Sequence, residues 1–191
     1  PTRAYFANLT RPFPPGYKQT FYVYYVNKKL FHKNSQLWNQ VKTSIYQEAR
    51  NKGFSPRFTS FSAEPDMLYI ALSSKKSENA AVFVRNSGTE NKIGVNLRGP
   101  MKSAGKLKSI GEECIKILLS SMKDFEHHLC KLEEDLLNQL IHGSVLNTKL
   151  KLKKPAGERV LLEMAKQGLI RLVKDGHTLT TLGKWYLSIK K

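Results

Sequence analysis

The chain has 191 residues, 40% of them hydrophobic, and a formal net charge of +17 from 32 Lys and Arg against 15 Asp and Glu. This apolar content argues against a disordered chain and suits one mid-sized domain or two small ones. The charge attracts anions such as nucleic acid, anionic lipid or phosphorylated metabolites, without selecting among them.

The sequence also limits the compartment and the cofactors. Cys114 and Cys130 fall in segments with helical periodicity, so we expect neither a disulfide framework nor a Cys-rich zinc site. His127 and His128 are adjacent and should point about 100° apart on a helix, which does not match the spacing of a helical metal pair. No apolar run approaches the roughly 20 residues of a membrane span. We expect a cytoplasmic protein without a metal site or membrane contact.

The N-terminal region begins with Pro rather than Met, which indicates a processed product or a piece of a longer protein. Residues 1–17 are rich in proline and are expected to form an extended arm, without the apolar centre of a signal peptide. The aromatic run Thr20–Val26 predicts a strand. Its tyrosines, near Lys18, Lys28 and Lys29, fit a base-stacking surface or a sheet face with a solvated edge, and the second is favoured.

The middle of the chain combines helix and strand signals. Ser35 is a typical N-cap before an apolar stripe of helical spacing that ends at Gly53. Strand-like runs follow at residues 57–62, 67–73, 80–84 and 92–97, and a helical pattern begins at Ala104. These elements predict an α+β fold in which helices cover one face of an antiparallel sheet.

A helical pattern continues from Ala104 almost to Gly143, which is long for one globular helix. It is either one helix joining two domains or, as we favour, two helices broken around residues 120–124 with Asp124 as the second N-cap. Residues 111–113, Gly-Glu-Glu, are interpreted as a solvated helix face.

Residues 145–191 behave as a separate basic module, with 11 Lys and Arg against 3 Asp and Glu. Pro155 can begin a helix that ends at Gly168, and Asp175-Gly176 between β-prone runs predicts a hairpin that ends around residues 179–183. This order resembles the second half of a winged-helix domain, with the hairpin as its wing. The helix before Gly143 and residues 149–154 would then supply the first helices. We expect an arm with an aromatic strand at 1–34, an α+β domain at 35–122 and a winged-helix-like module at 123–191.

The winged-helix resemblance implies contact with DNA or a role in protein docking. The cations expected at the DNA are four lysines before the candidate recognition helix, one arginine on it and one lysine on the wing: Lys149, Lys151, Lys153, Lys154, Arg159 and Lys174. Alternating lysines read the phosphate backbone, so such contact would not be sequence-specific.

Residues 85–92 form a polar loop between two strand-like runs. An Arg, two hydroxyls, a Gly and a Lys supply a planar fork, short donors and a free backbone, which suit a phosphate. A structural turn would have a similar composition. The core Arg-x-Ser-Gly-Thr-Glu and its flanking elements resemble the phosphate-contacting loop in the C-terminal domain of the α-D-phosphohexomutases, which include phosphoglucomutase and phosphomannomutase. The resemblance covers roughly residues 35–122.

That resemblance implies that the phosphate of a sugar phosphate is held by Arg85, Ser87, Gly88 and Thr89, with Lys92 as a supplement. Asn86 and Asn91 replace prolines usual in the family, and Gly94 replaces an arginine, for which Arg98 is a candidate substitute. The family's phosphoserine and magnesium loops belong to domains ahead of this one. We therefore expect no catalytic residue or cofactor in this chain, magnesium in the complete enzyme, and upstream catalytic domains as partners.

Overall fold

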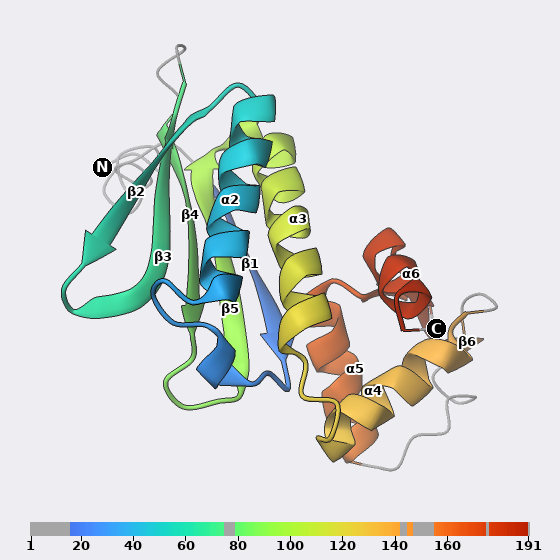
Figure 1. Cartoon of the computed structure of the whole chain (residues 1–191). Coiled ribbons are helices and arrows are strands. Elements are labelled where there is room, and N and C mark those ends of the chain that lie inside the picture. The colour runs from blue at the N-terminus through green and yellow to red at the C-terminus, as the bar shows by residue number, and fades with distance from the viewer. Residues whose placement is uncertain (1–15, 75–78, 142–144, 147–154, 175, 191) are drawn as a thin grey trace, which may run out of the picture.

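A five-stranded antiparallel sheet with two helices on one face forms the larger part of the molecule (Figure 1). The computed structural model describes residues 16–74, 79–141, 145–146, 155–174 and 176–190. The strand order is β1-β5-β4-β3-β2. The bounds are β1 Gly16–Tyr24, β2 Ser55–Phe61, β3 Glu64–Ser73, β4 Asn79–Asn86 and β5 Lys92–Pro100. The expected α+β class with an antiparallel sheet is confirmed.

Strand β1 begins earlier and ends earlier than the aromatic run predicted. Gly16 and Tyr17, expected in the arm, pair with Pro100 and Gly99 of β5, and the strand ends at Tyr24 rather than Val26. Tyr25 adopts a φ of 57°, which is outside the β region and ends the strand. The remaining residues of the expected arm lie outside the described residues.

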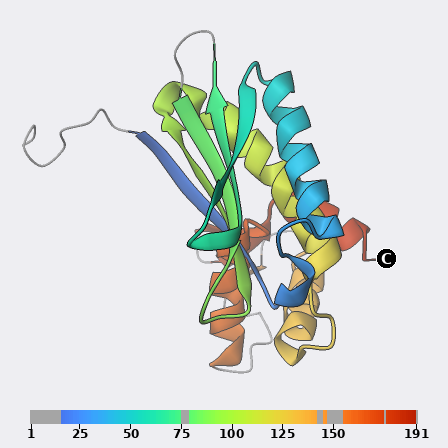
Figure 2. The ribbon, with the colours of Figure 1, turned by 60° about the vertical axis from the view of Figure 1, so that its left-hand side comes forward.

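The two faces of the sheet differ because successive side chains in a strand point to opposite sides. On one face, buried aliphatic side chains of the strands meet α2 (Gln36–Asn51) and α3 (Ala104–Met122). Figure 2 shows both helices on this side of the sheet. No helix of the described residues covers the other face.

Helix α2 starts and stops where the sequence predicts. The Ser35 hydroxyl accepts a hydrogen bond from the Trp38 backbone N–H at 3.2 Å, which caps the first turn. Gly53 follows the helix with a φ of 81°, a conformation that favours glycine. The helix thereby presents its buried stripe to the sheet and to α3.

Helix α3 corrects one interpretation. Gly111 is buried, and a Cβ atom there would lie 2.8 Å from Leu97 Cδ1 and 3.2 Å from Phe21 Cε2. The glycine permits close approach of the helix to the sheet, so residues 111–113 are not simply a solvated face.

The predicted helix break is confirmed, but its cap is not. Helix α4 spans His128–Gln139, and its N-cap is His127, whose Nδ1 accepts from the Leu129 N–H at 3.2 Å. Asp124 instead accepts from the Glu126 N–H one turn earlier. The His127 and His128 rings stack at 4.9 Å, since His127 has extended backbone rather than helical geometry.

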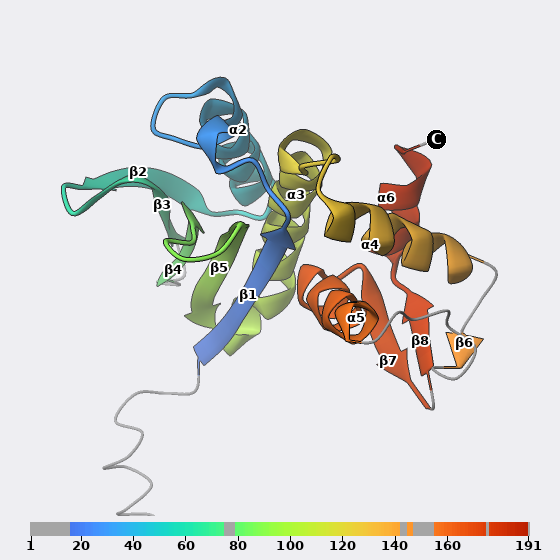
Figure 3. The ribbon, with the colours of Figure 1, turned by 90° about the horizontal axis from the view of Figure 1, so that it is seen from below.

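The C-terminal region adds helices and a small sheet beside α3 and β1 (Figure 3). The predicted hairpin is confirmed, but its second strand is short. The expected β-run into residues 180–183 is replaced by a helix whose N-cap Thr180 accepts from the Gly183 N–H at 3.0 Å. The three-stranded order is β6-β8-β7. The bounds are β6 Val145–Leu146, α5 Ala156–Gln167, β7 Ile170–Val173, β8 Gly176–Leu179 and α6 Thr181–Ser188, and the short 3-10 helices are η1 Lys28–Leu30 and η2 Met101–Ser103.

A buried polar network connects the two regions where α5 packs on β1. The Lys123 ammonium lies 2.8 Å from Glu133 Oε1 and 2.6 Å from Gln167 Oε1. Gln167 also accepts from the Tyr24 N–H at 3.3 Å and donates to Glu133. Tyr25 donates its hydroxyl hydrogen to Glu163 of α5. The hydrophobic core itself extends from the sheet into the C-terminal region.

Candidate phosphate-binding site

The loop between β4 and β5 surrounds one hollow of about 270 Å³. Its lining unites all five predicted phosphate-binding residues with neighbours from the loop and from β1 and β5: Arg85, Ser87, Gly88, Thr89 and Lys92, with Tyr22, Asn86, Gly94 and Asn96. The tertiary neighbours Tyr22 and Asn96 could not be assigned to this site from the loop motif. They reach it because Tyr22 pairs with Gly94, and Asn96 lies two residues along the same strand face.

Backbone hydrogen bonds hold the loop. The Ser87 N–H donates to the Lys92 carbonyl at 2.9 Å, and the Lys92 N–H donates to the Glu90 carbonyl at 2.8 Å. Lys28 donates from its ammonium to the Ser87 carbonyl at 2.7 Å, which fixes η1 to the loop. The Ser87 hydroxyl accepts from the Glu90 N–H at 3.3 Å. A ligand would therefore meet a folded turn rather than a chain that must first be ordered.

Asn86, one of the departures from the family pattern, has a structural role. Its Nδ2 donates to the Phe31 carbonyl at 2.8 Å and to the Lys28 carbonyl at 3.3 Å. A proline at this position could make neither bond, because both come from the amide side chain. Asn86 thus connects the loop with η1.

Gly88 is not required by the fold of the loop. Its φ is not among the positive values, and a Cβ atom there would meet nothing within 4 Å. The absence of a side chain leaves its backbone accessible to a bound group. This is the condition for recognition of an anion by backbone N–H groups.

Both cations of the loop already have carboxylate partners. The Arg85 guanidinium lies 2.9 Å and 3.0 Å from the two carboxylate oxygens of Glu64. The Lys92 ammonium is paired with Glu90 and lies 4.8 Å from the centre of the Tyr22 ring. The hydrogen bond from Lys92 lowers the pKa of the exposed Glu90 carboxyl. A phosphate must compete with these carboxylates for Arg85 and Lys92.

Gly94 and Arg98 behave differently from the family pattern. The Tyr22 ring would lie 3.5 Å from a Cβ atom at Gly94, so it occupies the space that a longer side chain would need. Arg98 donates to the Leu97 carbonyl at 2.7 Å and the Gln19 carbonyl at 3.1 Å, and its guanidinium lies over Phe83. Arg98 does not line the hollow, so it does not replace the missing arginine there.

Only two of the six predicted DNA-contact residues, Arg159 and Lys174, lie in the described part of the chain. Lys149, Lys151, Lys153 and Lys154 lie outside the described part of the chain. Arg159 donates from Nε to Glu163 Oε1 at 3.0 Å, and this hydrogen bond raises the pKa of its guanidinium. Lys174 is exposed beside the turn of the hairpin.

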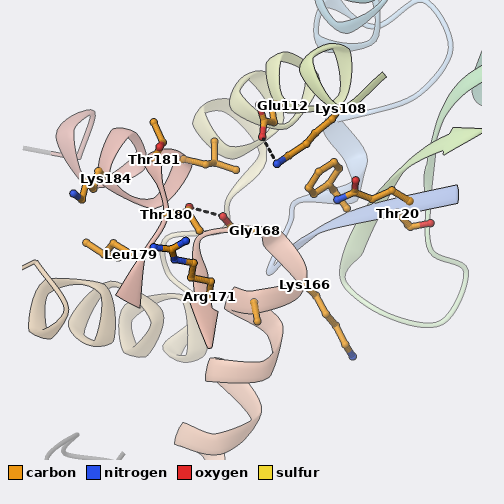
Figure 4. A pocket seen from close by; sticks show the side chains of 14 residues that line it. Thr20, Lys108, Glu112, Lys166, Gly168, Arg171, Leu179, Thr180, Thr181 and Lys184 are labelled. Atoms are coloured by element: carbon orange, nitrogen blue, oxygen red, sulfur yellow. Dashed lines mark hydrogen bonds and ion pairs between the residues drawn. The ribbon is translucent and has the colours of Figure 1, made fainter. Parts of the chain in front are cut away.

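A second hollow of about 620 Å³ lies between the sheet and the C-terminal region. Figure 4 shows Lys108 paired with Glu112 on α3, Arg171 beside Thr180, and Lys166 and Lys184 on other elements. The Lys108 and Glu112 charges lie 3.8 Å apart. This hollow could not be predicted from the sequence, because its lining comes from β1, α3, α5, β7, β8 and α6.

Within the described ranges, no group of three or more His, Cys, Asp and Glu side chains is placed to hold a metal ion. Cys114 and Cys130 are buried free thiols, and burial raises the pKa of both. Of the helices in the described part of the chain, none has both the length and the apolar character of a membrane span.

Comparisons of the chain with family models, curated proteins and solved structures give no match.

Proposed function

We propose that this chain is the C-terminal, sugar-phosphate-binding portion of a phosphohexomutase-like enzyme of the phosphoglucomutase or phosphomannomutase type. Its role is to hold the distal phosphate while domains ahead of it perform the phosphoryl transfer. The observation that carries this proposal is the convergence of Arg85, Ser87, Gly88, Thr89 and Lys92 on one hollow.

The chemistry of the hollow supports a phosphate as the ligand. Arg85 supplies a planar guanidinium, and Lys92 supplies an ammonium as a second positive charge for the phosphate. Hydroxyls of Ser87 and Thr89 can donate to phosphate oxygens, and Gly88 leaves its backbone open. Release of Glu64 upon binding would free Arg85 Nη1, which donates to both Glu64 carboxylate oxygens, for hydrogen bonds to the ligand.

The size of the hollow supports a role as one wall of a larger site. About 270 Å³ is below the roughly 300 to 1,000 Å³ of pockets that enclose a whole small molecule. A phosphate group fits the hollow, and the sugar ring would extend away from the loop toward other domains. In the complete enzyme, the residues of this chain would bind and position the substrate, and magnesium would neutralise phosphate charge elsewhere.

The test is an NMR titration with glucose 1-phosphate, with glucose as the ligand that lacks phosphate. We expect amide shifts at residues 85–92 with the phosphate ester and none with the free sugar. Arg85→Ala should weaken binding by about tenfold or more, because it removes a charge-assisted hydrogen bond. Shifts confined to other residues, or unchanged binding by Arg85→Ala, would contradict the proposal.

Two further variants make the titration specific. Arg57→Ala removes an exposed arginine from β2 of the same sheet and should leave phosphate binding within about twofold of the parent, since the site depends on direct contacts rather than on net charge. Glu64→Gln should strengthen binding, because it removes the carboxylate that competes for Arg85. If both arginine variants weaken binding equally, the effect is one of net charge and not of the loop.

A second candidate function is nucleic-acid or protein binding by the C-terminal module. It is supported by the order helix, strand, helix and hairpin, and by the sheet order β6-β8-β7, in which the hairpin strand β8 lies centrally. The test is salt-dependent binding of a generic DNA duplex by the whole chain. Changing Lys151, Lys153 and Lys154 together to Ala should weaken that binding; unchanged affinity would exclude the lysine segment as the contact.

A further inference from the structure

The sheet face opposite α2 and α3, which we call the open face, carries a regular array of side chains. Two of its rows run across all five strands, because paired residues lie side by side on the same face. From β1 to β2 in the order of the sheet, the first row is Lys18, Arg98, Ala81, Ala71 and Arg57, and the second is Thr20, Asn96, Phe83, Tyr69 and Thr59. With neighbouring strands about 4.8 Å apart, each row is about 19 Å long.

Aromatic rings occupy the centre of the open face. The Tyr69 and Phe83 rings lie 6.2 Å apart with an interplanar angle of 25°, and Phe61 meets Tyr69 edge-on at 5.3 Å. Tyr69 and Phe83 are half-buried, while Phe61 is 40% exposed. The aliphatic side chains of the same strands are buried on the other face. The aromatic groups therefore do not serve the main core.

Cations and hydrogen-bonding groups surround these rings. The first row places Lys18 and Arg57 at its ends, and the Arg98 guanidinium lies 5.6 Å from the centre of the Phe83 ring. In the second row, Thr20 donates to the Asn96 side chain at 2.9 Å, next to Phe83. No Asp or Glu occupies either row, all of whose residues lie in the described part of the chain. The open face thus combines positive charge with aromatic and amide surfaces.

We propose that the open face binds single-stranded nucleic acid. Bases stack on the aromatic patch of Phe61, Tyr69 and Phe83, while Lys18, Arg57 and Arg98 follow the phosphate backbone. Thr20, Asn96 and Thr59 can bond to base edges. An antiparallel sheet that presents aromatic side chains can stack two or three unpaired bases, and the row length allows for this number.

Several observations favour a single strand over other occupants. In a duplex the base faces are already stacked inside, so exposed rings on a sheet would have no base face to contact. An apolar protein partner would not use a row that begins and ends with Lys18 and Arg57. The proposal goes beyond the phosphate site, because Phe61, Tyr69, Phe83 and the first-row cations do not line that hollow.

The experiment measures fluorescence anisotropy of labelled ten-nucleotide oligo-U and oligo-T with the whole chain, beside a ten-base-pair duplex. The two single strands separate an RNA preference from a DNA preference. Both strands, or one of them, should bind more tightly than the duplex. Tyr69→Leu with Phe83→Leu should weaken binding about tenfold or more, because stacking is lost while apolar volume is kept.

Matched variants distinguish stacking from general effects. Phe125→Leu removes an exposed aromatic ring from the segment between α3 and α4, outside the five-stranded sheet, and should leave binding unchanged. Arg57→Ala with Arg98→Ala should weaken binding and reduce the salt slope by about 1.4, since each lost phosphate contact counts for about 0.7. Arg50→Ala with Lys131→Ala removes the same charge from the helices and should preserve the slope. Circular dichroism verifies that each variant is folded, and the arginine pair decides the matter if the aromatic pair unfolds.

Three results would overturn the proposal. The first is equal or tighter binding of the duplex, which would move the contact to another surface. The second is single-strand binding that is undiminished by both the aromatic and the arginine pairs. The third is the absence of oligonucleotide binding together with a dimer, seen by sedimentation, that the aromatic pair dissociates; this would assign the open face to a second copy of the chain. The Tyr69→Leu with Phe83→Leu variant should leave glucose 1-phosphate binding at residues 85–92 within about twofold, because neither ring lines that hollow, so the two proposals fail separately.

Discussion

Two ion pairs of almost the same length have different surroundings in this protein. Lys123 and Glu133 lie 2.8 Å apart with side chains that are 0% and 1% exposed. Arg85 and Glu64 lie 2.9 Å apart with side chains that are 53% and 46% exposed. The first pair lies at the junction between the sheet and the C-terminal region, and the second lies beside the phosphate hollow.

The surroundings decide what each pair can do. At the junction, removal of either partner leaves the other charge buried away from water. The remaining hydrogen bonds of that charge cannot compensate for the lost ion pair. At the loop, water solvates each charge if the pair opens, so Arg85 can exchange Glu64 for a ligand at small cost. The buried Lys123 network is therefore suited to hold α5 in position, whereas the exposed Arg85 is suited to bind a ligand. Four predictions test this contrast, in order of decreasing effect.

Lys123→Met should have the largest effect on stability. It leaves Glu133 charged and buried, and we expect a loss of about 3 to 5 kcal/mol in the free energy of unfolding. Urea denaturation followed by circular dichroism measures the change. The double variant Lys123→Met with Glu133→Leu removes both charges and should recover much of the loss. A loss below about 1 kcal/mol in the single variant would show that the network does not hold the junction.

Tyr25→Phe should have an intermediate effect. It removes the hydroxyl that donates to the buried Glu163, while the Arg159 partner of that carboxylate is kept. We expect a loss of about 1 to 2 kcal/mol in the unfolding free energy, measured by the same denaturation. Tyr22→Phe is the matched control from the half-buried side of β1 and should change stability by less than about 0.5 kcal/mol. Equal losses in the two variants would contradict a special role for the Tyr25 hydroxyl.

The junction should also make stability sensitive to alkaline pH. Burial, together with the hydrogen bond to Glu163, raises the pKa of Tyr25, and burial raises the pKa of Tyr24 to about 12. Because an unfolded tyrosine loses its proton near pH 10, this stabilisation is complete below about pH 10 and is lost as the pH rises toward the folded pKa. Urea midpoints from pH 8.5 to 11.5 should therefore fall in the upper part of this range. Tyr25→Phe should show a shallower decline; an identical decline would assign the effect to other groups.

Arg85→Ala should have the smallest effect on stability. The exposed pair with Glu64 is expected to contribute no more than about 1 kcal/mol, so the urea midpoint should change little. The same variant is expected to lose phosphate binding, which separates function from stability at this residue. A destabilisation above about 2 kcal/mol would instead make the Arg85 pair a structural element comparable to Lys123.

Local signals predicted most elements of the fold. The Ser35 cap, the Gly53 stop, the four strand-like runs after it and the Asp175-Gly176 hairpin depend on interactions within a few residues, and the sequence carries them directly. Helix α6 was missed because Leu179 to Leu182 has strand propensity. Its start depends on the Thr180 cap, and Gly183 packs close to the Leu169 backbone. Tertiary packing overrides such a local preference.

The candidate site likewise combines residues that local signals predicted with residues that only tertiary packing brings there. The motif identified Arg85, Ser87, Gly88, Thr89 and Lys92, and these residues do surround one hollow. The contributions of Tyr22 and Asn96, and the alignment of Arg98 with Phe83, depend on the pairing of β1 and β4 with β5. Strand pairing connects residues that are more than seventy positions apart, as Thr20 and Asn96 are, and no local pattern specifies that register.

The basic charge, the α+β class and the polar loop could be predicted from the sequence alone, because composition, periodicity and turn residues act locally. The contact of Lys123 with Glu133 and Gln167 in the core, and the aromatic rings among cations on one sheet face, depend on the tertiary structure. Burial and cross-strand pairing are properties of the packed chain and not of any short segment. Water solvates the charge of a lysine or a glutamate in an exposed loop, whereas in the core each charge depends on its partner for stabilisation.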